Sequence, residues 1–182
     1  TDTLSFINLT LSEKELGAIA GKYRNINDNW GYLDIKIKEG KLVSGTNTIK
    51  FTGKNKISIN NQVYEVRKNE LVQKTSSGDF IFKKVQDVPE KIQYEYLQGN
   101  YKSNDVTIGY TFSYEEEALY AITPGLNKIK LSPIYKNGNT ISFRGLSNGL
   151  AIIYHFTVNN AKEVSLVLSL PRADKIPFEK IN

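Results

Sequence analysis

Residues 16–25 (LGAIAGKYRN) and residues 96–105 (YLQGNYKSND) share one arrangement of residue types. Glycine can adopt the positive φ that is needed where a helix turns into a strand. A tyrosine two positions later would then be the first inward side chain of that strand. Both stretches have this glycine and tyrosine after an apolar cluster, as Gly21–Tyr23 and Gly99–Tyr101. The repetition predicts two tandem copies of one small domain.

The first copy begins with a pattern typical of a short helix. Ser12 followed by Glu15 fits a capping box, in which each side chain bonds the backbone N–H of the other residue. Gly21 is expected to end the helix. The apolar residues in between fall on one helical face, namely Leu16, Ile19 and Ala20.

The second copy begins with a similar pattern. Pro89 suits the first turn of a helix because its missing N–H would have no helical partner there. Gly99 is expected to end this helix as well. The apolar stripe between them consists of Ile92, Tyr96 and Leu97. We therefore expect a short helix at the start of each copy.

After each helix the hydrophobic period changes to that of β-strands. Segments 32–45 and 108–124 both alternate apolar with polar residues, turn at a Glu-containing tip and return. The later segments correspond in the same order: 47–60 with 127–145, 62–73 with 151–169, and 79–85 with 176–181. Each copy thus predicts about eight short strands joined by tight turns.

Short strands joined by short hairpins make an antiparallel meander, and closure into a barrel removes its two exposed edges. We therefore predict an all-β protein of two tandem small antiparallel β-barrels, each with a short N-terminal helix that plugs one open end. The first barrel is expected at residues 1–88 and the second at residues 89–182. The alternative is one large sandwich of all strands, which is disfavoured because each copy has its own helix and closing strand.

The composition limits the possible chemistry. The 182 residues are 40% hydrophobic and 11% aromatic, which suffices for a substantial core, and the net charge is +5. No cysteine is present, so disulfides and thiolate metal sites are excluded. The chain begins at Thr1 and has no methionine, so we expect a processed product or a fragment of something larger. No apolar run approaches the ~20 residues of a membrane-spanning helix.

Three stretches have residue types used in catalysis or binding, and each has a structural explanation. GLSNG (145–149) matches the nucleophile-elbow pattern around Ser147, but strand patterns on both sides indicate a hairpin turn. His155 is the only histidine and is expected at a half-exposed strand position. Residues 115–117 (EEE) point in alternate directions and are expected at a hairpin tip. We therefore predict no catalytic residue, no metal and no cofactor.

The basic residues do not predict a nucleic-acid partner. Binding of nucleic acid requires a basic groove with exposed stacking aromatics. Here the lysines alternate with apolar residues, as on the outer face of a barrel, and the aromatic residues alternate into the core.

Residues 9–25 (LTLSEKELGAIAGKYRN), 38–42 (KEGKL) and 80–85 (FIFKKV) together support a resemblance to a known family. The chain resembles the small barrels that follow the catalytic domain in many serine β-lactamase-like proteins, including penicillin-binding-protein-like esterases and D-aminopeptidases. Those barrels are lipocalin-like and begin with an L-x-x-[apolar]-x-G-x-Y pattern. Its matches in the first copy are Leu16, Ile19, Gly21 and Tyr23, and in the second copy Leu97, Gly99 and Tyr101.

The resemblance implies an accessory module of such a hydrolase. The catalytic domain of that group carries Ser-x-x-Lys and Tyr-x-Asn elements, and no Ser-x-x-Lys occurs in this chain. The implied partner is a serine-hydrolase domain in the same or a neighbouring chain. The implied setting is bacterial and extracytoplasmic, either periplasmic or secreted.

The barrel interior is the one site that the sequence leaves open. A barrel of about eight strands is either filled by side chains or wide enough for one small ligand, and large aromatics with short strands favour a filled interior. If a ligand enters, aromatic residues would contact it, namely Trp30, Tyr32, Tyr110, Tyr114 and Tyr154. We therefore expect a non-catalytic accessory or interaction module, with lipocalin-like binding of a small apolar ligand as the alternative.

Overall fold

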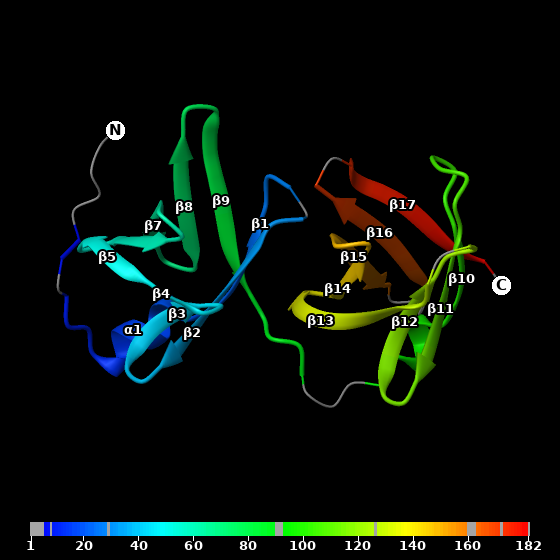
Figure 1. Cartoon of the computed structure of the whole chain (residues 1–182), viewed down its shortest axis with the longest axis horizontal. Coiled ribbons are helices and arrows are strands. Elements are labelled where there is room, and N and C mark those ends of the chain that lie inside the picture. The colour runs from blue at the N-terminus through cyan, green and yellow to red at the C-terminus, as the bar shows by residue number, and fades with distance from the viewer. Residues whose placement is uncertain are drawn as a thin grey trace. The chain divides into compact units, whose positions relative to one another are not determined.

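The computed structural model describes residues 6, 7, 9–28, 30–89, 93–125, 127–159, 163–171 and 173–181. The chain divides into two compact units, Thr1–Val85 (unit 1) and Gln86–Asn182 (unit 2), both built from antiparallel strands (Figure 1). The predicted all-β fold of two small barrels is confirmed. The single-sandwich alternative is wrong, because each unit has its own hydrophobic core.

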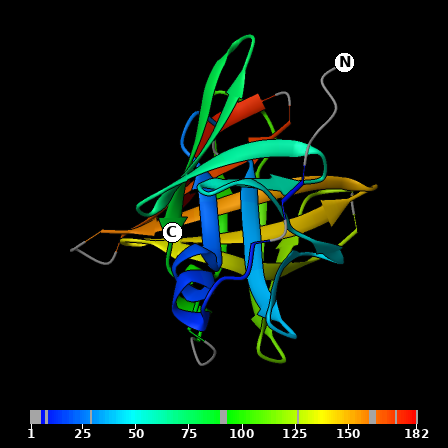
Figure 2. The same cartoon turned by 90° about the vertical axis from the view of Figure 1, so that its left-hand side faces the viewer.

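Unit 1 contains one helix, α1 (Glu13–Ile19), and a nine-stranded sheet in the described residues. Figures 1 and 2 both show α1 at one end of this unit and the turn between the last two strands at the other. The strands are β1 (Gly21–Asn25), β2 (Tyr32–Lys38), β3 (Lys41–Ser44), β4 (Asn47–Thr48), β5 (Lys50–Gly53), β6 (Lys56–Ile59), β7 (Gln62–Arg67), β8 (Glu70–Thr75) and β9 (Gly78–Val85).

The sheet of unit 1 closes through one bent segment. In the order β4-β3-β2-β1-β9-β8-β7-β6-β5, the first and last strands are consecutive in the chain and separated by Ile49 alone. The N–H of Ile49 donates to the carbonyl of Leu42 at 2.9 Å. A single segment therefore pairs with β3 before the bend and with β6 after it, which curls the sheet into a barrel.

Unit 2 is a closed barrel whose eight strands follow one another in sequence order. Its strand β13 takes the place of β4 and β5 together, so the predicted correspondence of the two copies is confirmed. The strands are β10 (Gly99–Lys102), β11 (Tyr110–Glu115), β12 (Ala118–Ile122), β13 (Ile129–Asn137), β14 (Thr140–Ser147), β15 (Leu150–Val158), β16 (Val164–Leu170) and β17 (Ala173–Ile181).

The two units begin differently. In unit 1 the predicted capping box of Ser12 and Glu15 is present, and it starts α1 at Glu13. In unit 2 the predicted helix is wrong in length: Pro89 is not helical, and the described residues contain one 3₁₀ turn, η1 (Glu95–Leu97). Ile92 lies outside the described residues. This start has no side-chain N-cap, which explains why a single turn forms where α1 has two.

In each unit a glycine–tyrosine pair and the helical turn before it close one end of the barrel. We call this end the plug; it includes Gly21 and Tyr23 in unit 1 and Gly99 and Tyr101 in unit 2. Tyr23 is buried, and its hydroxyl donates to the carbonyl of Ile19 at the end of α1 at 2.7 Å. Tyr101 is buried as well and donates to the carbonyl of Leu97 at 2.9 Å. Each bond satisfies both a buried hydroxyl and a helix-terminal carbonyl that lacks a helical partner.

A lysine completes each plug, and the sequence analysis did not foresee it. Lys84 is the cross-strand partner of Tyr23, and its Nζ donates to the carbonyl of Ala18 at 3.0 Å. Lys180 is the cross-strand partner of Tyr101, and its Nζ donates to the carbonyl of Tyr96 at 3.0 Å. The signal was the F-x-K spacing in both closing strands, where the lysine follows an inward phenylalanine.

The plug glycines are required by their backbone angle, and a side chain at either position would also displace a lysine. Gly21 has φ +139° and Gly99 has φ +131°, so the predicted positive φ is confirmed. A Cβ on Gly21 would lie 2.5 Å from the Cε of Lys84, and one on Gly99 would lie 2.7 Å from the Cε of Lys180. The lysine stem therefore occupies the space that a side chain would need.

Candidate ligand-binding pocket

The three site residues predicted in the second barrel lie together in unit 2. Tyr154 is fully buried, and Tyr110 and Tyr114 are half-buried against the same core. The rings of Tyr110 and Tyr154 meet edge-to-face with centroids 5.9 Å apart. Tyr114 meets the ring of Tyr94 edge-on at 6.3 Å.

Aromatic rings fill the interior of unit 2 around these residues. The ring of Phe112 packs edge-on against Tyr101, Tyr154 and Phe156, with centroids between 5.0 and 5.8 Å apart. Each such pair contributes roughly 0.5–1.5 kcal/mol beyond the burial of its area. Burial also raises the pKa of Tyr154, since a phenolate would lose its hydration there. Unit 2 thus has the filled interior that its large aromatics favour.

The two site residues predicted in the first barrel lie far from the plug. Tyr32 begins β2 and pairs with Arg24, whereas Gly21, beside α1, pairs with Ile35 further along β2. Trp30 lies just before Tyr32 and is 37% exposed. Both residues therefore stand at the end of unit 1 opposite to α1.

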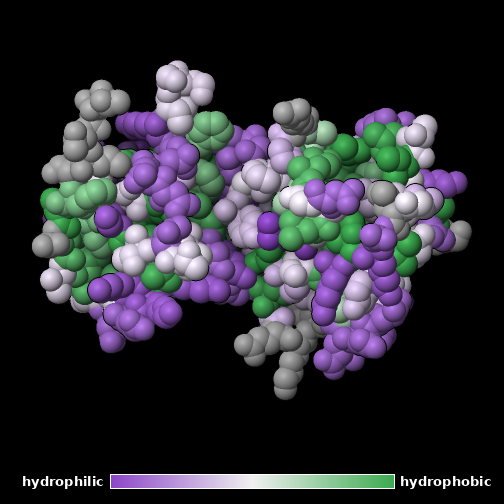
Figure 3. All heavy atoms as spheres, viewed as in Figure 1, coloured by the Kyte–Doolittle hydropathy of each residue, from purple (hydrophilic) through white to green (hydrophobic). Residues whose placement is uncertain are grey.

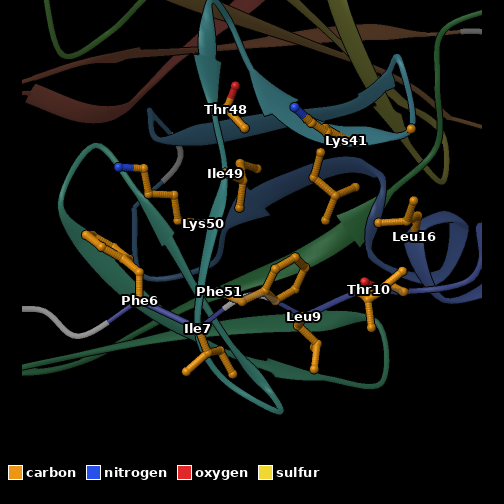
Figure 4. A pocket seen from close by; sticks show the side chains of 13 residues that line it. Phe6, Ile7, Leu9, Thr10, Leu16, Lys41, Thr48, Ile49, Lys50 and Phe51 are labelled. Atoms are coloured by element: carbon orange, nitrogen blue, oxygen red, sulfur yellow. The ribbon is translucent and has the colours of Figure 1, made fainter.

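Unit 1 has a pocket of about 650 Å³ at its plug end, a volume within the range of small-molecule sites (Figure 4). Three lining residues belong to the core, since Leu16, Leu42 and Ile49 are 6%, 1% and 4% exposed. The other lining residues come mainly from the segment before α1 and from the bent segment β4–β5, and half of them are apolar. The pocket therefore extends from the surface of unit 1 to its core.

The segment before α1 forms one wall of the pocket. The N–H of Ile7 donates to the carbonyl of Phe51 at 2.9 Å, which attaches this segment to β5. Leu11 packs half-buried against the core, whereas Phe6 and Ile7 are 45% and 41% exposed. Figure 3 shows a hydrophobic surface over the β5 edge of unit 1.

Two lysines supply positive charge to the pocket. Lys41 and Lys50 are among the lining residues, and the described lining contains no carboxylate. The Nζ of Lys50 lies 4.5 Å from the centroid of the Phe6 ring, a cation–π distance. Figure 4 places Phe6 and Lys50 at one end of the pocket and Leu16 at the other.

A smaller polar pocket of about 380 Å³ adjoins the charged end, and the two pockets share Phe6, Thr48 and Lys50. Its other lining residues are hydrogen-bonding, namely Asn47, Ser58, Asn60 and Asn61. The side-chain amide of Asn47 donates to Oδ1 of Asn60 at 2.8 Å, which fixes part of this lining. The combined site thus has apolar side chains between its Leu16 end and its Lys50 end, a second lysine (Lys41) along one side, and polar side chains beyond Lys50.

Sequence reasoning missed this pocket because residues 6–11 precede the repeat and show no strand or helix period. One signal was available. Leu16 lies five positions before Gly21, and Tyr94 lies five positions before Gly99, so the two residues are equivalent in the repeat. A smaller side chain at one of two equivalent positions indicates unfilled space.

The stretches with residue types used in catalysis have structural roles. Ser147 ends β14 and is followed by a turn with positive φ at Asn148 and Gly149, so the predicted hairpin is confirmed. The Nδ1 of His155 lies 2.8 Å from the hydroxyl of Ser142, and its Nε2 lies 3.2 Å from that of Ser169. The half-exposed position predicted for His155 is wrong, since it is 8% exposed, and these two bonds explain how a polar ring is buried.

The acidic residues 115–117 lie at the end of β11 and in the turn after it. Glu115 forms an ion pair with Lys128, which together with hydrogen bonding holds the pKa of that carboxyl below its usual value. Glu116 and Glu117 make the turn after it. Within the described ranges, no three His, Asp, Glu or Cys side chains gather as metal ligands.

No protein-family model matches the sequence, and no curated protein matches it. No helix in the described part of the chain is long and apolar enough to cross a bilayer.

Proposed function

We propose that this chain is a non-catalytic accessory module of a bacterial serine β-lactamase-like hydrolase, acting in the periplasm or outside the cell. One observation supports the resemblance on which this rests. The motif residues Leu16, Ile19, Gly21 and Tyr23 meet in the plug of unit 1, and a tyrosine–carbonyl bond of the same kind recurs in unit 2. The motif residues thus form one end of a barrel, which supports the resemblance.

The test is genetic and enzymatic. We expect the natural gene, or a gene beside it, to encode a Ser-x-x-Lys domain. We also expect the isolated chain to leave p-nitrophenyl esters and D-amino-acid anilides intact, whereas the catalytic domain hydrolyses them with a kcat/KM that depends on the presence of this chain. Turnover by the isolated chain would contradict the proposal, as would a catalytic domain that works identically without it.

A second function is favoured by the pocket of unit 1, which is binding of a small, largely apolar ligand. Its volume and apolar lining support this function, whereas the filled interior of unit 2 does not. A ligand that binds only the native state raises the melting temperature with its concentration. A thermal-shift screen with fatty acids and retinoids, followed by native mass spectrometry, should give such a rise and a one-to-one adduct. Identical melting curves with every compound would argue against binding.

A further inference from the structure

We propose that the pocket of unit 1 binds a single acyl chain with an anionic head group, with the tail toward Leu16 and the head at Lys50. This inference rests on the second proposed function and names its ligand class and site.

The copies differ in how they fill the plug end. In unit 2, Tyr94 is buried and packs edge-on against Tyr114 at 6.3 Å and against Phe143 at 4.9 Å. In unit 1 the equivalent position is occupied by Leu16, which lines the pocket. A leucine cannot replace the volume of a buried tyrosine ring, so unit 1 leaves space where unit 2 has side chains.

The pocket suits a narrow apolar chain. It reaches Leu42 and Ile49, both nearly fully buried, so an occupant must extend from the surface into the core. Each methylene that leaves water for this lining gains about 0.8 kcal/mol. Leu9 and Phe51 add apolar side chains to the lining, and both are half-buried.

The charges select the head group. Lys41 and Lys50 both line the pocket, and its described lining has no carboxylate to neutralise their charges. Around Lys50 the adjoining polar pocket adds the hydroxyl of Thr48 and the side-chain amide of Asn61. A carboxylate in this place would accept charge-assisted hydrogen bonds, whereas a cationic head would be repelled. An acyl anion therefore matches both ends of the site.

The test compares three probes of equal chain length by isothermal titration below their micelle concentrations: dodecanoate, dodecan-1-ol and dodecyltrimethylammonium. We expect dodecanoate to bind most tightly and the ammonium compound least. Lys50→Gln should weaken dodecanoate about fivefold, the value of one partly exposed ion pair, and leave dodecan-1-ol unchanged. The matched control is Lys130→Gln, which removes an exposed lysine from the second copy and should change neither affinity.

Two variants locate the site. Leu16→Tyr introduces the side chain that unit 2 has at this position and should abolish binding of dodecanoate and dodecan-1-ol alike. Leu9→Gln, outside the barrel core, should weaken both several-fold even if Leu16→Tyr fails to fold, and circular dichroism reports folding in each case. Unchanged binding in folded variants would overturn the location.

The outcomes separate this inference from the function on which it rests. Equal affinity for dodecanoate and dodecan-1-ol, with no effect of Lys50→Gln, would overturn the anionic head while ligand binding stands. Absence of binding by all three probes would overturn the acyl-chain site, and a thermal shift with retinoids alone would still support ligand binding.

Discussion

At the scale of single residues, alanine substitutions at Gly21 and Gly17 should change the free energy of unfolding in opposite directions. Gly21→Ala should destabilise the protein by about 1–3 kcal/mol, because alanine is strained at φ +139° and its Cβ would displace Lys84 from the carbonyl of Ala18. Gly17→Ala is the matched control. It lies within α1 with nothing within 4 Å of an added Cβ, so it should stabilise by about 0.5–1 kcal/mol. Urea unfolding measures both, and effects of the same sign would contradict the assigned role of Gly21.

Buried tyrosines make stability sensitive to alkaline pH. Burial raises the pKa of Tyr23 from 10.0 to about 12, and the pKa of Tyr94 similarly. The unfolded chain loses these protons near pH 10 while the native state keeps them, so the free energy of unfolding should be constant below pH 10 and fall between pH 10 and 12. Burial lowers the pKa of Lys84, which opposes this fall but involves one group against several tyrosines.

The measurement is urea unfolding across this pH range, with phenolate absorbance as a second signal. Tyr23→Phe removes one titrating group and one buried hydrogen bond. It should therefore be about 1 kcal/mol less stable at pH 8, and its stability should fall less steeply above pH 10. Stability that is independent of pH between 10 and 12 would show that these phenols are not shielded in the native state.

At the scale of elements, the equivalent turns β2–β3 and β11–β12 have the same backbone conformation but different residues. The β11–β12 turn has Glu116 at φ +49° and Glu117 at φ +61°, whereas the β2–β3 turn has Glu39 at φ +52° and Gly40 at φ +71°. Turns of this geometry favour Asn-Gly, because the left-handed region costs other residues roughly 1 kcal/mol each. Replacing residues 116–117 by Asn-Gly should stabilise by about 1–2 kcal/mol, and Gly40→Glu should destabilise by about 1 kcal/mol. Thermal melting of both variants provides the check, and a loss of stability with Asn-Gly would contradict it.

At the scale of the whole molecule, the repeat determined what could be predicted. Fold class, strand correspondence and the capping box follow from local periodicity and from comparing one copy with the other, so they were accessible. The plug lysines had only the F-x-K spacing as a signal, because Lys84 and Lys180 stand in strands that also contain other lysines. The prediction of a helix from Pro89 was wrong because it rested on apolar spacing alone, and this start has no side-chain N-cap to stabilise a longer helix. The pocket was missed because its wall, residues 6, 7 and 9–11, lies outside the repeat and is held by contacts that local periodicity does not show, such as the bond from Ile7 to Phe51.

The separate cores predict that the units fold by themselves. The core of unit 2 is built from residues of that unit, with Tyr101, Phe112 and Phe156 at its centre, and its strands form a closed ring. Since a domain with its own core and no unpaired ladder needs no partner for its hydrogen bonds, residues 86–182 expressed alone should unfold cooperatively and keep a near-UV circular dichroism signal from ordered tyrosines.

Residues 1–85 should do the same but with lower stability, because the pocket leaves apolar surface uncovered, whereas Tyr94 fills the equivalent space in unit 2. A fragment 86–182 without near-UV signal would mean that its aromatic core depends on the rest of the chain. If fragment 1–85 were the more stable of the two, the uncovered apolar surface of its pocket would not lower its stability as expected.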